Sequence, residues 1–471
     1  MNQKTSAINA YQFRRFGGFD SRAASDRTTP GGAAPRRRCI LYLTHRIPFP
    51  PDKGDKIRSY HWLKHLASRH DVFLACFIDD ARDRRHVLAL RTLCRDVLAI
   101  PVSSARMMRR AGFALVRDTL RGRRDPLTLA AYDHPAMRHR LALWSRMVEF
   151  DAVLAFSAAM APYALNVSAR RRVLDLCDCD SRKWLDYAAA LRGRSVWRPA
   201  RWLNPIYQRE GRSLHDAELS WVGRFDATTV VNDKERRLLR MALPASRVHI
   251  VRNGVAAVPA TPIPAAPILG FVGVLDYRPN IEALEWFIND IWPRIRVRQP
   301  DAVFHVIGRS PGRVVKRLSR RPGIRLIGPV DDITTQWSRL RVAVAPLRTA
   351  RGIQNKVLEA MAHGRPVVTT TRVAEGLAHS SGAPLLSADG AAEFADAACR
   401  LIESDELCQS LGAAGRRHVR EQWDWTGPTG DMERLILGAP AGSGGRPARR
   451  RRAPRRRGGG GARAGAEAAA P

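Results

Sequence analysis

Short hydrophobic runs alternate with helical stretches along most of this chain, and that alternation constrains the fold more than any other feature. The runs are almost continuous in hydrophobicity, which is typical of strands buried on both faces of a parallel sheet. Strands that alternate with helices predict βαβ units and an α/β fold. The expected strands form a first set at 39–44, 71–77, 96–102, 152–156, 172–176 and 227–232, and a second set at 268–273, 302–308, 324–328, 342–347 and 366–370.

The segment between the two sets differs in composition. Residues 256–267 read AAVPATPIPAAP, a Pro- and Ala-rich sequence typical of a connector between domains. With 471 residues, 45% of them hydrophobic, the chain can fill two cores of ordinary size. We predict two Rossmann-like, doubly wound parallel-sheet domains, at 39–252 and 253–437, that face each other across a cleft. Open α/β sheets bind ligands at the carboxyl ends of their strands, so we expect the chemistry in that cleft.

The net charge of +35 is spread unevenly. Two tails whose composition predicts disorder, residues 1–38 and 438–471, carry +6 and +8, and the rest of the chain carries +21. A dense basic surface attracts polyanions, but basic and aromatic residues do not alternate here as they do in RNA-binding modules. We therefore expect no specific nucleic-acid recognition. The excess of arginine over lysine leaves two explanations open, a functional basic surface or a coding bias.

The seven cysteines are scattered and odd in number, which indicates a reducing compartment and not a disulfide framework. The sequence shows no apolar leader, and its longest apolar stretch is too short to span a bilayer. We expect a cytoplasmic protein whose membrane contact, where there is one, is peripheral. Residues 105–126 combine seven arginines with Met108, Phe113, Val116 and Leu120. This stretch either lies on an anionic membrane surface or forms a helix whose apolar side faces the core.

The most informative segment is residues 346–370, PLRTARGIQNKVLEAMAHGRPVVTT. Its pattern predicts a strand, a glycine-containing loop, a helix over about 353–363 and a second strand. Gly364 is a natural left-handed cap for the helix. The helix begins just after Gly352, where free backbone N–H groups and the positive end of the helix dipole would bind a diphosphate.

Charged residues surround the start of that helix. Arg348, Arg351 and Lys356 supply positive charge, and Glu359 lies three residues beyond Lys356 on the same face. An ionised carboxylate can accept both hydrogen bonds of a ribose diol, so the segment predicts a nucleotide site. The alternative is a solvated helix with an ordinary ion pair.

These residues also carry a resemblance. KVLEAMAHGRPVV resembles the nucleotide-binding signature of glycosyltransferase family 4, whose fold is the two-domain GT-B type, and VRNGV at 251–255 resembles the start of that family's C-terminal domain. THRIPFPPDKGDKIRSYHWLKHLA, LDLCDCDSRKWLDYA, GFVGVLDYRPNIEALEWF and RGIQNKVLEAMAHG together resemble sugar transferases associated with bacterial exopolysaccharide clusters linked to the PEP-CTERM system. The resemblance covers about residues 39–437.

The resemblance implies a retaining transfer of a sugar from a nucleotide-diphosphate donor to a glycan or lipid-linked acceptor, without metal or other cofactor. In such enzymes the departing diphosphate helps to deprotonate the acceptor hydroxyl, so no enzyme nucleophile is expected. The implied catalytic residues are Arg351, Lys356 and Glu359. The implied donor-binding residues are Gly273, Arg278, Arg348, Gly352, Ile353, Gln354, Asn355 and Glu359.

The first domain would approach donor phosphate and acceptor through the loop that contains Gly54, where glycine permits close backbone contact. His45 has an equally simple alternative role as a loop histidine. Asp178 and Asp180 form the only Asp-x-Asp sequence, at a strand end; they would position the acceptor, or Asp180 would cap the following helix. The candidate residues of this domain are His45, Lys53, Gly54, Lys56, Arg58, Asp178 and Asp180.

The chain departs from the family pattern at two positions. A second acid usually lies eight residues before the one at Glu359, where this chain has Arg351, and a basic residue usually follows the glycine at 273, where it has Val274. Our hypothesis is that Arg351, with Lys356 and Arg278, neutralises the leaving diphosphate.

Two other functions stay open at this stage. A sugar-nucleotide epimerase of the same fold would turn over the donor without an acceptor. A non-catalytic polyanion-binding protein would bind RNA or acidic polysaccharide and show no saturable nucleoside diphosphate site.

Overall fold

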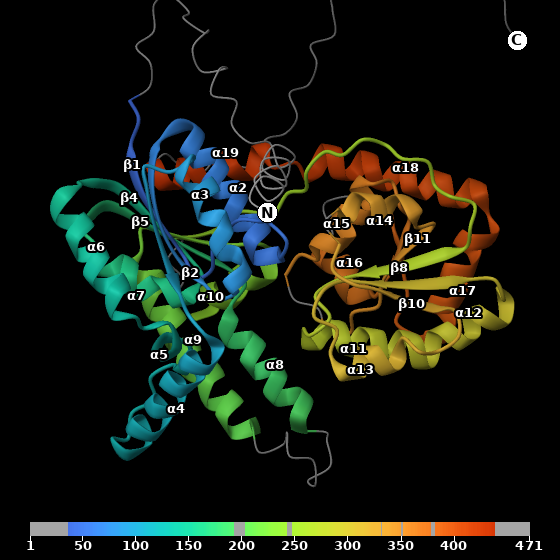
Figure 1. Ribbon diagram of the computed structural model, residues 1–471, viewed down its shortest axis with the longest axis horizontal. Helices are drawn as coiled ribbons and strands as arrows, with labels where there is room; N and C mark the ends of the chain where they lie inside the picture. Colours follow the sequence, from blue (N-terminus) through green and yellow to red (C-terminus); the bar gives the residue numbers. More distant parts are fainter. Residues whose placement is uncertain are drawn as a thin grey trace, which may run out of the picture.

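The computed structural model describes residues 36–192, 203–242, 247–330, 332–349, 352–377 and 382–438. These residues form two lobes that lie side by side, each with a sheet covered by helices (Figure 1). The first sheet has the strand order β3-β2-β1-β4-β5-β6-β7 and the second has β10-β9-β8-β11-β12-β13. Paired strands run parallel throughout both sheets. The prediction of two Rossmann-like parallel-sheet domains is therefore confirmed.

The first lobe is built around β1, whose residues alternate between two cores. Leu41 and Leu43 join the core on one face of the sheet, and Ile40 and Tyr42 join the core on the other. Its strands are β1 (Cys39–Thr44), β2 (Asp71–Ile78), β3 (Asp96–Pro101), β4 (Phe150–Phe156), β5 (Ala169–Cys177), β6 (Ala227–Val230) and β7 (Val248–Ile250). Its helices are α2 (Gly54–Arg69), α3 (Val87–Arg91), α4 (Ser104–Leu120), α5 (Leu127–Tyr132), α6 (Pro135–Met147), α7 (Ala161–Leu165), α8 (Asp180–Arg192), α9 (Asn204–Arg224) and α10 (Asp233–Ala242), with 3-10 turns η2 (Ala81–His86) and η3 (Ala158–Met160).

The second lobe has one large core. Its strands are β8 (Ile268–Val272), β9 (Val303–Ile307), β10 (Ile324–Ile327), β11 (Val342–Ala345), β12 (Val367–Thr369) and β13 (Leu386–Ser387). Its helices are α11 (Arg278–Trp286), α12 (Trp292–Arg298), α13 (Arg313–Leu318), α14 (Ile333–Arg339), α15 (Asn355–Ala362), α16 (Thr371–Leu377), α17 (Ala391–Glu403) and α18 (Asp405–Gln422).

A π-helical turn, Phe287–Ile291, lies between α11 and α12. Pro293 follows it and has no N–H to donate to the carbonyl four residues earlier, so the helix widens there. Phe287, Ile288 and Ile291 are nevertheless all fully buried in the core.

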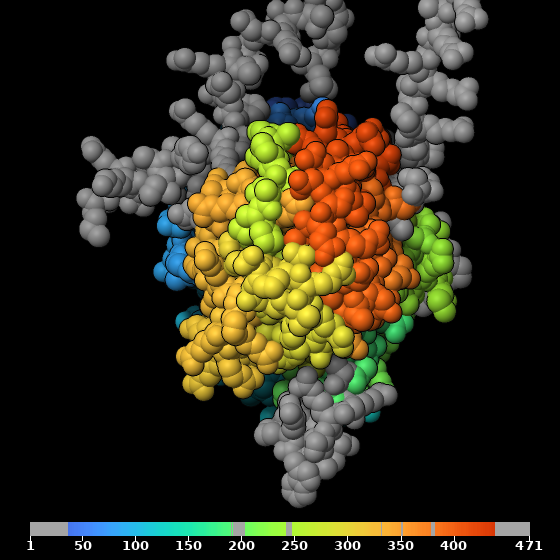
Figure 2. Space-filling view, turned by 90° about the vertical axis from the view of Figure 1, so that its right-hand side faces the viewer, coloured from blue at the N-terminus to red at the C-terminus, as the bar shows by residue number. Residues whose placement is uncertain are grey.

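The chain crosses back to the first lobe at its end. Helix α19 (Thr426–Leu437) follows shortly after the end of α18 and packs on α2, β4 and β5 of the first lobe (Figure 1). Its Glu433 accepts hydrogen bonds from His65 at 2.7 Å and His70 at 3.0 Å. The connector between the lobes lies beside α18 on the surface of the second lobe, as the yellow-green segment of Figure 2 shows, and Arg416 donates to the carbonyl of Val258 at 2.7 Å. The two lobes are thus joined by two passages of the chain.

Candidate active site

The junction between β11 and α15 lies where the two lobes meet. Gly352 adopts a left-handed φ of 61° before the helix, and Gly364 ends it with a φ of 70°. The side chain of the N-cap residue, Gln354, makes no capping hydrogen bond to the first turn of α15. Asn355, the first residue of the helix, accepts a hydrogen bond at 3.0 Å from Asn253, which follows β7. A β-carbon at Gly54 would lie 3.5 Å from the side-chain amide nitrogen of Asn355. The helix start therefore faces the first lobe.

Lys356 is anchored at the carboxyl end of β8. Its ammonium nitrogen donates to Oδ1 of Asn280 at 2.7 Å and lies 4.2 Å from the ring centre of Phe271. A β-carbon at Gly273 would lie 3.1 Å from that nitrogen, so glycine leaves the space that the ammonium group uses. Burial lowers the pKa of Lys356 to about 7, and the charge of Glu359 opposes that shift.

Glu359 lies one turn further along α15 and is partly buried. Burial raises the pKa of its carboxyl to about 7, against the attraction of Lys356. Val357, Leu358, Ala360 and Met361 around it are buried in the second core. This burial argues against a helix open to solvent on its outer face, and the carboxylate does not project into bulk water.

Other donor-site candidates surround this pair. Arg278 donates from Nε to Glu282 at 2.9 Å, and its guanidinium lies 5.5 Å from the ring centre of Tyr187 on α8 of the first lobe. Arg348 is exposed, 5.4 Å from the ring centre of Trp286. Ile353 packs against the second core, and Gln354 precedes the first residue of α15. Arg351 lies outside the described residues.

The basic residues of the loop after β1 have acidic partners. His45 lies 3.3 Å and Arg46 2.7 Å from Asp55 Oδ2, and Lys53 lies 4.0 Å from Asp79. Burial of Asp55 works to raise its pKa, but hydrogen bonds from His45 and Arg46 hold that pKa well below its usual range. Acids at the start of α2 and after β2 therefore hold this loop in place.

Lys56 and Arg58 of α2 point into the first lobe. Lys56 is 1% exposed and forms an ion pair with Asp83 at 2.6 Å. Arg58 is fully buried and donates to Asp175 at 2.8 and 3.0 Å. Acids of the first lobe therefore hold both cations, and a role for either one as a phosphate or acceptor contact stays a prediction.

Arg58 nevertheless reaches α15 through other residues. It donates to Oδ1 of Asn253 at 2.9 Å, and Asn253 in turn donates to Asn355. Asp175 also accepts from Trp62 at 2.8 Å and from Thr229 at 2.9 Å. A polar network thus runs from the centre of the first lobe through Asn253 to the first residue of α15.

Asp178 and Asp180 follow β5 at the same interface. A β-carbon at Gly352 would lie 2.7 Å from Oδ2 of Asp178 and closer still to Oδ1, so the carboxylate rests against the turn that leads into α15. Asp180 lies in the first turn of α8. The structure therefore brings Gly54 and Asp178 of the first lobe to the start of α15, together with Gly352 and Asn355 of the second.

Sequence reasoning missed three residues that hold this arrangement, Asn253, Asn280 and Asp175. Asn253 lies inside the VRNGV motif, which was a usable signal. Asp175 and Asn280 likewise lie inside LDLCDCDSRKWLDYA and GFVGVLDYRPNIEALEWF, but only their contacts reveal their roles.

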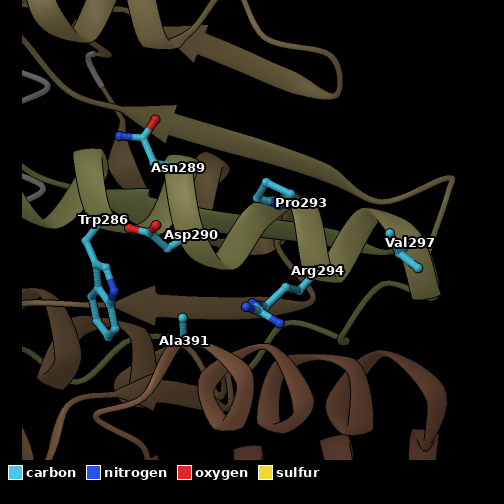
Figure 3. Close-up of a pocket in the computed structure, with 7 residues that line it drawn as sticks. All are labelled: Trp286, Asn289, Asp290, Pro293, Arg294, Val297 and Ala391. Carbon is cyan, nitrogen blue, oxygen red and sulfur yellow. The ribbon is translucent and has the colours of Figure 1, made fainter.

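A shallow hollow of about 510 Å³ lies elsewhere, on the helical layer of the second lobe (Figure 3). Trp286, Asp290 and Arg294 line it, with Ala391 at the start of α17. It contains none of the candidate residues. In the described part of the chain, no three His, Cys, Asp or Glu side chains are grouped to hold a metal ion, and no helix has the length and hydrophobicity to cross a membrane.

Comparisons with known proteins agree with this geometry. Residues 266–404 match the family model described as Glycosyl transferases group 1. This range contains the second sheet and the whole of α15. No protein of curated function matches the chain by sequence.

Solved structures resemble the whole fold. HepE of Anabaena, in complex with UDP and glucose, matches with a TM-score of 0.60 and 13% identity, over 85% of this chain and 100% of HepE. A TarM mutant of S. aureus, in complex with Fondaparinux, alpha-GlcNAc-glycerol and UDP, matches with a TM-score of 0.57 and 9% identity. The match covers 85% of this chain and 99% of TarM. The alpha,alpha-trehalose 6-phosphate synthase of Burkholderia multivorans matches with a TM-score of 0.56 and 12% identity. The match covers 86% of this chain and 99% of the synthase. The structural matches show that the fold is of the GT-B type, and the family match identifies residues 266–404 as similar to a Glycosyl transferases group 1 domain.

Proposed function

We propose that this protein is a retaining glycosyltransferase that moves a sugar from a nucleotide-diphosphate sugar to a glycan or lipid-linked acceptor in bacterial exopolysaccharide or other surface glycan synthesis. One observation carries the proposal: Lys356 and Glu359 lie partly buried, one turn apart, at the helix start that faces the opposite lobe. The UDP named with HepE and TarM supports a nucleotide donor.

The reaction would follow from the charges at this junction. The diphosphate binds the free N–H groups at the start of α15, with Lys356 beside it, while Glu359 accepts the hydrogen bonds of the ribose diol. The bond from the sugar to the diphosphate breaks as the acceptor oxygen bonds on the same face, and the acceptor proton passes to the departing diphosphate. Lys356, Arg278, Arg348 and Arg351 would neutralise that leaving group, so we propose that no metal is needed.

A thermal-shift screen of UDP, GDP and ADP tests the donor class. A ligand that binds only the native state raises the melting temperature in proportion to its affinity and concentration, so one of the three should raise it and EDTA should leave the shift unchanged. No shift with any of them would contradict the proposal. Turnover of the corresponding nucleotide sugar without an acceptor would instead indicate an epimerase.

We further propose that α4 places the enzyme on an anionic membrane, at the inner face of the cytoplasmic membrane where a lipid-linked acceptor would lie. Met108, Phe113, Val116 and Leu120 are 60–82% exposed, so the alternative in which they face the core is wrong. Only Ala114 and Asp118 of the helix are buried, and α4 lies at the lower edge of the first lobe in Figure 1. Exposed arginines at 106, 109, 121, 123 and 124 supply the complementary charge.

Liposome flotation tests this surface. The protein should float with vesicles containing phosphatidylglycerol and not with phosphatidylcholine alone, and replacing Met108, Phe113 and Leu120 with serine should release it. Equal flotation of the triple variant, or no flotation of the wild type at any salt concentration, would exclude α4 as the contact.

A further inference from the structure

Asp178 occupies an unusual position between the lobes. It follows β5 of the first lobe, yet its carboxylate packs on Gly352 of the second, close enough that no β-carbon fits there. The left-handed φ of Gly352 and this contact both require glycine at position 352. The two lobes therefore meet at a carboxylate and at the turn that opens α15.

One oxygen of the Asp178 carboxylate has no hydrogen-bond donor among the described residues. Among the described residues, Oδ1 of Asp178 is buried and accepts no hydrogen bond. A buried acceptor without a donor is costly, and it is expected where a ligand supplies the missing donor. Burial raises the pKa of Asp178 to about 7, helped by the charges of Glu235 on α10 and Asp180 on α8 and opposed by Arg58 and Lys183.

The position of the carboxylate selects among the donors that could reach it. A phosphate at the start of α15 brings negative charge, which a carboxylate repels. The sugar attached to that diphosphate brings neutral hydroxyl groups, which a carboxylate binds well. The neighbouring position 351 is also the one where the chain has arginine in place of the acid that the family pattern predicts.

We propose that Asp178 binds a hydroxyl group of the donor sugar from across the interface and so supplies from the first lobe the carboxylate that the second lobe lacks at position 351. This inference rests on the proposed function, because it takes a nucleotide sugar as the ligand. It makes the contact between Asp178 and Gly352 a determinant of sugar binding and not only of packing.

The test compares two ligands that differ only in the sugar. Calorimetric titration of UDP with UDP-glucose, GDP with GDP-mannose and ADP with ADP-glucose first identifies the pair that binds the wild type. Asp178→Ala should then lower the affinity for the nucleotide sugar by roughly 10-fold or more and leave that for the nucleoside diphosphate unchanged, because one charged hydrogen bond is lost. Asp178→Asn should recover part of the loss, since its amide oxygen still accepts a hydrogen bond.

The control is Asp216→Ala, which removes an exposed carboxylate from α9 and should change neither affinity. The inference would be overturned if Asp178→Ala lost equal affinity for both ligands, or lost no affinity for the nucleotide sugar. A lower melting temperature of this variant without ligand would assign Asp178 to packing. A wild type that binds no nucleoside diphosphate would instead contradict the proposed function, so the two failures are distinguishable.

Discussion

The two lobes share a fold but treat the charges at their strand-to-helix junctions differently. After β1 of the first lobe, Lys56 is paired with Asp83 at 2.6 Å, and Asp55 accepts from Arg46 and contacts His45. After β11 of the second lobe, Lys356 donates to the neutral amide of Asn280. Acids therefore neutralise Lys56 and Arg46 at the first junction, whereas among the described residues the hydrogen-bond acceptor of Lys356 is a neutral amide and Glu359 acts on it through its charge.

This difference shows why equivalent basic sequences can have unequal functions. A cation with an internal carboxylate partner contributes to the fold, and binding an anion would require that pair to break. A buried lysine on a neutral partner is costly without an anion, which is the condition under which a ligand gains most from its charge. Lysines and arginines follow strands of both sheets, and among the described residues of these two junctions Lys356 is the lysine whose hydrogen-bond acceptor is a neutral amide.

The largest expected effect is a loss of activity when Lys356, but not Lys56, is replaced. Lys356→Met should lower kcat/KM by roughly 10²- to 10³-fold, because it removes a preorganised charge from the leaving group. The melting temperature without ligand should not fall, since a desolvated charge is also removed. Steady-state rates of this variant check the prediction, with Lys316→Met, which changes an exposed lysine of α13, as the control. Equal activity of the two variants would mean that Lys356 takes no part in the chemistry.

Lys56→Met should give the opposite result. It leaves Asp83 buried without its partner, which typically costs about 3–5 kcal/mol of unfolding free energy. The activity per folded molecule should stay close to that of the wild type. Urea unfolding together with rates measured well below the transition would show this. A stable but inactive variant would instead support Lys56 as a contact of the phosphate or the acceptor.

The pH dependence of nucleotide binding sharpens the comparison further. Burial holds the pKa of both Lys356 and Glu359 at about 7, and binding needs the protonated lysine and the ionised glutamate. Affinity for the nucleoside diphosphate should therefore be greatest near pH 7 and fall by up to about tenfold per pH unit on either side. Lys356→Arg keeps its charge above pH 7, so the affinity of this variant should still fall below pH 7 but no longer above it. If titration calorimetry shows the same fall in affinity above pH 7 in the variant, Lys356 does not cause that fall.

The smallest expected effect is on stability, from a partly exposed ion pair between the two lobes. Arg309 after β9 forms an ion pair with Asp52 of the first lobe at 2.8 Å, where both side chains are partly exposed. Arg309→Ala should lower the unfolding free energy by less than about 1 kcal/mol, and less still at high salt. A larger loss in thermal melts at low and high salt would mean that this pair holds the lobes together.

The fold was predictable because its strands are buried on both faces and appear in the sequence as nearly continuous hydrophobic runs. Every expected strand is present, while β7 and β13, of three and two residues, are too short to show a pattern. The return of α19 to the first lobe was not predicted, since an amphipathic helix does not specify which core it covers.

The candidate site was predictable only where the chemistry is local. The start of α15 combines its glycine, lysine and glutamate within eight residues, so the pattern itself describes the geometry. Lys56 and Arg58 lie 27 and 117 residues from the acids that bind them, and their partners could not be inferred from spacing. The contact of Asp178 with Gly352 is likewise a product of tertiary structure.

The central claim is that the carboxylate of Glu359 holds the ribose of a nucleotide whose diphosphate lies at the start of α15. Titration calorimetry tests it with UDP, GDP or ADP, whichever binds, and the 2′,3′-dideoxy form of the same nucleotide, on the wild type and on Glu359→Ala. We predict that the wild type prefers the ribonucleotide and that this preference disappears in the variant. The same preference in both proteins would contradict the claim.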